Sequence, residues 1–159
     1  MCACLVMTSG ELRVREAAHD AWRGITSRAE RLADPAPDRT LINYIAAHAR
    51  YPEQAESIAR MLTTACERHG GNLDPLMFAV IARYESTLDP ASINPSTHCA
   101  GLIQIHPLHR EAMRDMGLDF DSEPDRLLFG CILFAAQGWK PWSVRGRAKR
   151  EYQEIRGER

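Results

Sequence analysis

Apolar residues recur along most of the chain at the spacing of helices that bury one face. In residues 52–71 the i, i+3, i+4, i+7 series comprises Ile58, Met61, Leu62 and Ala65. Prolines and glycines separate this stretch from similar ones before and after it. The pattern predicts helices over residues 10–33, 41–51, 52–71, 75–86, 107–117 and 125–138. The fold class that we expect is mainly α.

The segment 75–86 is apolar on nearly all sides, which is typical of a central, buried helix. Asp74 and Pro75 suit the N-cap and the first helical position. A turn-rich segment, residues 87–101, follows the helix at once. We expect a small hairpin or an irregular loop there, beside a substrate cleft.

Glu85 is an acidic residue near the end of this buried helix. An unpaired buried charge costs on the order of several kcal/mol, so the residue has two interpretations. It is a solvated side chain on the last turn, which composition alone favours. Alternatively it is a general acid, because the negative end of the helix dipole and apolar neighbours favour the protonated carboxyl.

Gln104 stands alone as an amide within the apolar stretch "GLIQIHP", residues 101–107. It is either a core amide with its hydrogen bonds satisfied or a group directed into a cleft. These residues by themselves favour neither interpretation.

The order of these features resembles the soluble lytic transglycosylase (SLT) domain. The matching residues are Glu85-Ser86, Asp89-Pro90, Gly101-Leu102, Gln104 and Pro107. The helix, turn and "DP" before the glutamate helix also resemble the segment that precedes this helix in the family. The resemblance therefore covers roughly residues 53–144. It implies the lysozyme-like helical fold that this family shares with goose-type lysozymes.

The resemblance also implies a reaction, cleavage of the β-1,4 bond between N-acetylmuramic acid and N-acetylglucosamine in peptidoglycan. Glu85 would protonate the leaving oxygen and then act as base on the muramoyl 6-hydroxyl, giving a 1,6-anhydro product. No second acid has a comparable motif context, and Asp89 in "LDP" is better interpreted as a turn or capping residue. By the same resemblance Ser86 and Gln104 would bind substrate, and Gly101 would let backbone approach it.

Two departures from the family pattern concern substrate detail. The family's later "AYN" signature is replaced by "GWKPWSV", which resembles the Trp-rich ending of compact, often phage-encoded SLT-like domains. Trp139 and Trp142 would then stack on sugars or wall the cleft, with core packing as the alternative. The loop before Gly101 carries His98 and Cys99 instead of the family's small residues.

A metal site is not expected, although four possible ligands cluster in sequence: His98, Cys99, His106 and His109. Their spacing matches neither a zinc finger nor H-E-x-x-H, and the family needs no metal or other cofactor. The net charge of -1 gives the whole chain no general attraction for nucleic acid. No apolar run is long enough to suggest a membrane span.

The two ends of the chain bear on delivery and on domain organisation. The start of the chain lacks a signal peptide, so we expect cytoplasmic synthesis and action on the cell wall, either as a virion component or after lysis. We expect an N-terminal helical arm (1–45), an SLT catalytic domain (46–144) and a charged tail (145–159), helical or disordered. The arm or the basic tail could dock onto a virion or secretion apparatus.

Two alternatives to a transglycosylase stay open. One is a muramidase that uses water on the same scaffold. The other is a structural component of a virion or secretion machine that has kept the fold without the chemistry.

Overall fold

The computed structural model describes residues 36–158, of which 61% are helical. The helices are α2 (Arg39–His48), α3 (Ala55–Arg68), α4 (Pro75–Ser86), α5 (Arg110–Asp115), α6 (Glu123–Gln137) and α7 (Arg145–Arg156). Short 3-10 turns, η2 (Pro52–Gln54) and η3 (Pro107–His109), precede α3 and α5. The mainly α class is therefore confirmed, and the predicted helix over residues 10–33 lies outside the described residues.

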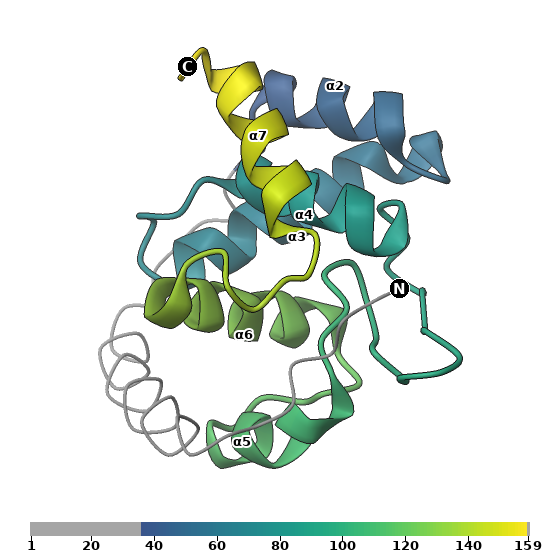
Figure 1. The fold of residues 1–159 in the computed structure, drawn as a ribbon, viewed down its shortest axis with the longest axis vertical. Helices are drawn as coiled ribbons and strands as arrows, with labels where there is room; N and C mark the ends of the chain where they lie inside the picture. Colours follow the sequence, from purple (N-terminus) through teal and green to yellow (C-terminus); the bar gives the residue numbers. More distant parts are fainter. Residues whose placement is uncertain (1–35, 159) are drawn as a thin grey trace.

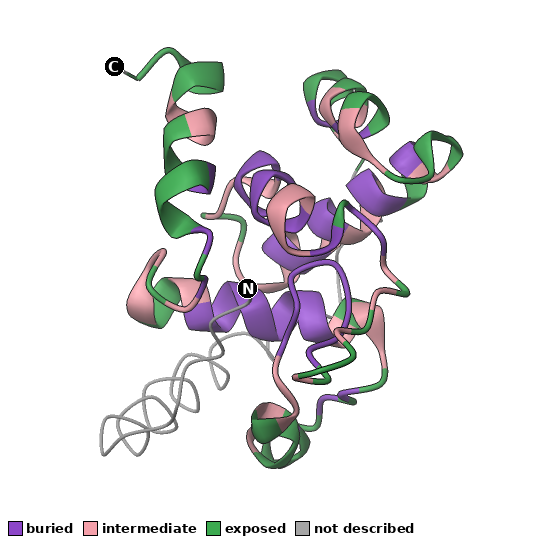
Figure 2. Ribbon diagram, turned by 45° about the vertical axis from the view of Figure 1, so that its right-hand side comes forward, coloured by how far each residue is buried: buried purple, intermediate pink, exposed green. Residues whose placement is uncertain are grey.

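Helix α4 is the centre of the core, as its sequence predicts. Seven consecutive residues from Leu76 to Ala82 are buried, and Figure 2 shows α4 and α6 as largely buried helices. The Asp74 carboxylate accepts a hydrogen bond from the Leu76 amide at 3.0 Å, which satisfies one of the unpaired donors of the first turn. The predicted bounds of this helix, 75–86, are those observed.

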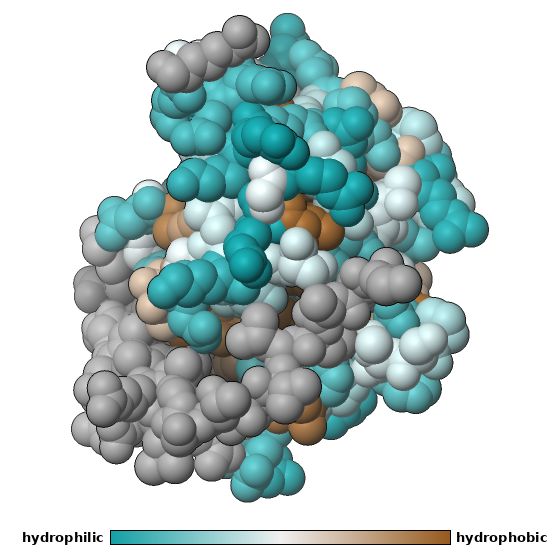
Figure 3. All heavy atoms as spheres, in the orientation of Figure 1, coloured by the Kyte–Doolittle hydropathy of each residue, from teal (hydrophilic) through white to brown (hydrophobic). Residues whose placement is uncertain are grey.

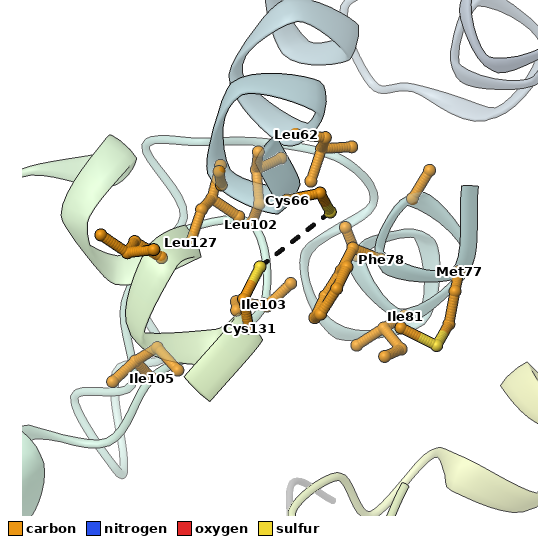
Figure 4. Packing of buried hydrophobic residues seen from close by; sticks show 14 of the residues in the cluster. Leu62, Cys66, Met77, Phe78, Ile81, Leu102, Ile103, Ile105, Leu127 and Cys131 are labelled. Carbon is orange, nitrogen blue, oxygen red and sulfur yellow. Dashed lines mark hydrogen bonds between the residues drawn. The ribbon is translucent and has the colours of Figure 1, made fainter. Parts of the chain in front are cut away.

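Helices α3 and α6 pack on each other and close the core around α4. Figure 4 shows the thiols of Cys66 in α3 and Cys131 in α6 facing one another, with their sulfur atoms 4.0 Å apart. Both are free and buried, and burial raises the pKa of the Cys131 thiol. Gly138 ends α6, as the sequence predicts, with a φ of 61°.

The charged tail forms helix α7, one of the two states expected for it. Helix α7 packs on α4, as Figure 1 shows, and its Ala148 is fully buried. At the other end, the expected boundary after residue 45 falls inside α2, whose Leu41 and Ile45 belong to the common core. Residues 39–45 and 145–156 thus pack on the same core as the rest of the described chain.

The long connection between α4 and α5 is an irregular loop, not a hairpin. Among residues 36–158 there are no strands, and this loop has two isolated antiparallel bridges, Ile93 with Ala100 and Ala100 with Ile105. Leu102, Ile103 and Ile105 enter the core, where Figure 4 shows them among residues of α3, α4 and α6.

The face in Figure 3 is mainly hydrophilic where α2 and α7 lie in Figure 1. Among the helices that the structure describes, none combines the length and the apolar character needed to cross a membrane.

Candidate active site

Glu85 lies half-buried on the last turn of α4, where the chain changes direction. Thr87 and Leu88 follow with φ values of 58° and 57°, in the left-handed region that residues with a side chain rarely adopt. The Leu88 amide donates to the Ala82 carbonyl oxygen at 3.2 Å and so caps the helix end. The turn after Glu85 is thus held in one conformation despite its local cost.

Asp89 stabilises the same turn. It is buried, and its Oδ1 accepts a hydrogen bond from the Ala91 amide at 2.9 Å. Its Oδ2 lies 3.7 Å from the guanidinium of Arg50, whose backbone amide donates to the Thr87 carbonyl oxygen at 3.0 Å. These contacts agree with the interpretation of Asp89 as a turn residue.

Ser86 joins the end of α4 to the "GLIQ" segment. Its hydroxyl donates to the Leu102 carbonyl oxygen at 2.7 Å, and the Ala82 carbonyl oxygen lies 3.1 Å from it. The side chain is buried, so both neighbours of its hydroxyl are backbone groups of the protein. The structure therefore places Ser86 beside Glu85 as a link between two segments, not as an exposed ligand for substrate.

Gly101 lies where two side chains of α6 approach the backbone most closely. Its φ is 82°, and an added Cβ would lie 2.1 Å from Glu123 Oε2 and 2.7 Å from Arg126 Nε. Only glycine fits this place without strain or displacement. We expected Gly101 to let the backbone approach substrate, but the groups that lie close to it are the side chains of Glu123 and Arg126.

Gln104 is a satisfied core amide, the first of its two interpretations. It is buried with a φ of 53°, and its Nε2 donates to the carbonyl oxygens of Gly101 at 2.9 Å and Ser92 at 3.3 Å. Backbone bonds between Ala100 and Ile105, both 3.0 Å, close the same turn. We call residues 100–105, closed in this way, the platform.

The two tryptophans differ in exposure. Trp142 is only 4% exposed, packs on Phe78 and donates from Nε1 to the Ile103 carbonyl oxygen at 3.1 Å. Trp142 therefore belongs to the core, the alternative that was left open, and offers no ring face to a sugar. Trp139 is half-buried, with ring centroids 5.5 Å from Phe134 and 6.0 Å from Tyr152.

An ion pair in the first two turns of α6 is buried, which the sequence pattern did not predict. Glu123 and Arg126 contact the platform, with side chains that are 10% and 9% exposed. Burial raises the pKa of Glu123, although the Leu102 amide and Arg126 act in the opposite direction. The spacing of an acid and an arginine at i and i+3 was the available signal, but on most helices this spacing marks a solvated pair.

A second missed cluster surrounds Glu151 of α7. Its carboxylate accepts hydrogen bonds from the hydroxyls of Tyr44 at 2.7 Å and Tyr84 at 2.6 Å, and it pairs with Arg83. Burial alone would raise the pKa of Glu151, but the two tyrosines and Arg83 lower it below its usual range. Burial and the bond to Glu151 raise the pKa of Tyr44. Glu151 thus fastens α7 to α2 and α4.

The histidines in and after the loop between α4 and α5 do not form a metal site with other side chains of the described residues. Within residues 36–158, no three His, Cys, Asp or Glu side chains are grouped so that they could hold a metal ion. His106 caps η3 through Nδ1, which accepts from the Leu108 amide at 3.0 Å. His109 packs on Phe129, and burial lowers its pKa to about 4, with the charge of His106 as a smaller cause.

Glu85 places a half-buried carboxyl group next to a turn that hydrogen bonds within the protein stabilise. A half-buried carboxyl on a fixed turn is suited to proton transfer. A scan against protein-family models, a search of curated proteins and a search of solved structures found no match to this chain.

Proposed function

We propose that the chain is a peptidoglycan lytic transglycosylase with Glu85 as its general acid and base. The observation that carries the proposal is the position of Glu85, half-buried on the last turn of a buried helix. The 2.7 Å bond from neighbouring Ser86 to Leu102 joins this turn to the "GLIQ" segment, so the two parts of the SLT-like pattern meet in space. The lysozyme-like fold is part of the same proposal.

The reaction needs one carboxyl group. The Glu85 carboxyl donates its proton to the glycosidic oxygen, and the bond from that oxygen to C1 of N-acetylmuramic acid breaks. The 6-hydroxyl of the same sugar then attacks C1, and the Glu85 carboxylate takes the hydroxyl proton. The product is a 1,6-anhydro sugar, and Glu85 is protonated again without the second carboxylate that most glycosidases use.

Ser86, Gly101 and Gln104 act in this proposal by supporting the site. The Ser86 hydroxyl and the Gln104 side-chain nitrogen are bonded to protein backbone, and Gly101 leaves room for Glu123, so all three fix the geometry of the platform. Rigid support matters because small displacements of a reacting group reduce the rate steeply. Trp139 keeps a partly exposed ring beside Phe134 and Tyr152, and stacking of this ring on a sugar is part of the proposal.

Analysis of the products from purified sacculi tests the proposal. Muropeptides that end in anhydromuramic acid, lighter by one water molecule than hydrolysed ends, are the expected result in mass spectrometry. Reducing muramic acid ends would show a muramidase instead. No released fragments at all would contradict both enzymes and favour a structural component of a virion or secretion machine.

The proposed partner is the glycan strand of peptidoglycan, reached as a virion component or after lysis. Immunodetection of the chain in purified virions and in cleared lysate distinguishes these two routes.

A further inference from the structure

The ion pair of Glu123 and Arg126 has no part in the chemistry proposed above, yet it is buried against the platform. Both groups of the pair are bonded. Glu123 Oε2 lies 2.8 Å from Arg126 Nε, and Arg126 Nη1 donates to the Phe120 carbonyl oxygen at 2.6 Å. Burial of two charges is costly unless each is well paired, so such a pair at this place calls for a reason.

The second carboxylate oxygen of Glu123 is hydrogen-bonded to the platform. Glu123 Oε1 accepts a hydrogen bond from the Leu102 amide at 2.8 Å. The carbonyl oxygen of Leu102 accepts the bond from Ser86 at 2.7 Å. One residue, Leu102, is therefore held on its amide side by α6 and on its carbonyl side by α4.

Gly101 gives independent support for the importance of this contact. A Cβ at this position would lie 2.1 Å from Glu123 Oε2, so any other residue would push the carboxylate away. The platform backbone is shaped to admit Glu123.

We infer that Glu123 is a positioning residue for Glu85, acting through the Leu102 peptide and the Ser86 hydroxyl. The inference rests on the proposed function for its effect on catalysis. Loss of the Leu102 contact would leave Ser86 and the last turn of α4 free to shift, which lowers the rate of the chemical step more than substrate binding.

The test variant must remove the contact without leaving a buried charge alone. Glu123→Leu together with Arg126→Met replaces the pair by apolar side chains, a change that other buried pairs tolerate. Glu123→Gln together with Arg126→Met is the conservative variant, because the amide oxygen can still accept from the Leu102 amide and no buried charge is left alone. The matched control removes the exposed pair between the start of α5 and the loop before α6, Arg110→Gln with Asp121→Asn, whose bonds are 3.0 and 2.9 Å.

Two measurements are made on the full chain. In NMR spectra, the backbone amides of Glu85 and Ser86 are expected to shift in the Leu/Met variant and to stay in place in the control. On peptidoglycan, kcat of the Leu/Met variant is expected to fall by about tenfold or more, with KM within about twofold. The Gln/Met variant should recover most of the lost kcat.

Unchanged Glu85 and Ser86 amides in the Leu/Met variant would overturn the inference, and so would an unchanged kcat in an active enzyme. A wild-type chain without lytic activity would instead contradict the proposed function. The shifts of the Glu85 and Ser86 amides would then be the only test of whether Glu123 positions Glu85.

Discussion

The hydroxyl of Ser86 occupies the point where the end of α4 meets the platform. It is buried and bonded to the Leu102 carbonyl, while the adjacent Glu85 stays half-buried. Adjacent residues on a helix point about 100° apart, so one can be fixed in the core while the next faces outward. This division of roles explains why a motif of two residues serves both structure and proposed chemistry.

Alanine substitutions at Gly101 and Gly117 measure how closely Glu123 packs against the platform. Both have positive φ values, 82° and 71°, but an added Cβ meets Glu123 only at Gly101 and nothing within 4 Å at Gly117. We expect Gly117→Ala to cost about 1 kcal/mol of unfolding free energy for the backbone conformation. Gly101→Ala should cost about 2 kcal/mol more, because the carboxylate must move. Urea denaturation measures both losses, and equal losses would contradict the crowded geometry.

His109 predicts a dependence of stability on pH. Its pKa is lowered to about 4 in the folded protein, from the 6.5 of a free imidazole, because the ring is buried. The unfolded chain therefore binds this proton more tightly, and the stabilisation is complete above pH 6.5 and lost as the pH falls toward 4.

We expect this loss to amount to about 2–3 kcal/mol in the wild type and to be absent from His109→Leu. Urea denaturation of both proteins across that range gives the difference directly, since the other titrating groups are shared. If the unfolding free energy of both proteins fell equally between pH 6.5 and 4, His109 would not be the cause of the loss.

At the scale of the elements, α7 is a structural part of the described fold. Glu151 joins it to Tyr44 of α2 and to Tyr84 and Arg83 of α4. Tyr152 donates to Asp74 Oδ2 at 2.9 Å, at the N-cap of α4. A charged helix is thus held by its inward-facing polar residues more than by an apolar face.

Truncation after Val144 tests the contribution of α7. We expect the thermal midpoint to fall by roughly 10 °C, because the bonds of Glu151 and Tyr152 and the burial of Ala148 are lost together. Truncation after Gly157 is the matched control and should leave the midpoint unchanged. Similar midpoints for the two truncated chains, read by circular dichroism, would mean that α7 is only a solvated tail.

Local signals in the sequence predict the elements well but not the contacts between them. Asp74, Pro75 and Gly138 set helix ends by backbone chemistry that depends on a few neighbouring residues, and the structure has those ends. Glu123 and Glu151, by contrast, look like solvated charges. Their burial depends on partners 21 and 107 residues away, Leu102 and Tyr44, which no local pattern indicates. The amide of Gln104 had two equal interpretations for the same reason.

At the scale of the whole molecule, one core supports the proposed site from several directions. The platform is bonded to α4 through Ser86, to α6 through Glu123 and to the segment before α7 through Trp142. Such a site depends on the complete fold, because each bond joins segments that are distant in sequence. We propose that this frame holds Glu85 as the catalytic carboxyl group.

The most direct test is the rate of glycan release from sacculi by wild type, Glu85→Gln and the control Glu154→Gln, an exposed glutamate of α7. We expect Glu85→Gln to lose at least about a hundredfold in rate, because the amide cannot donate and recover a proton, while Glu154→Gln stays within about twofold. Circular dichroism melting of the three proteins checks that they fold alike. A folded Glu85→Gln protein that releases glycan fragments at the wild-type rate would contradict the catalytic role of Glu85.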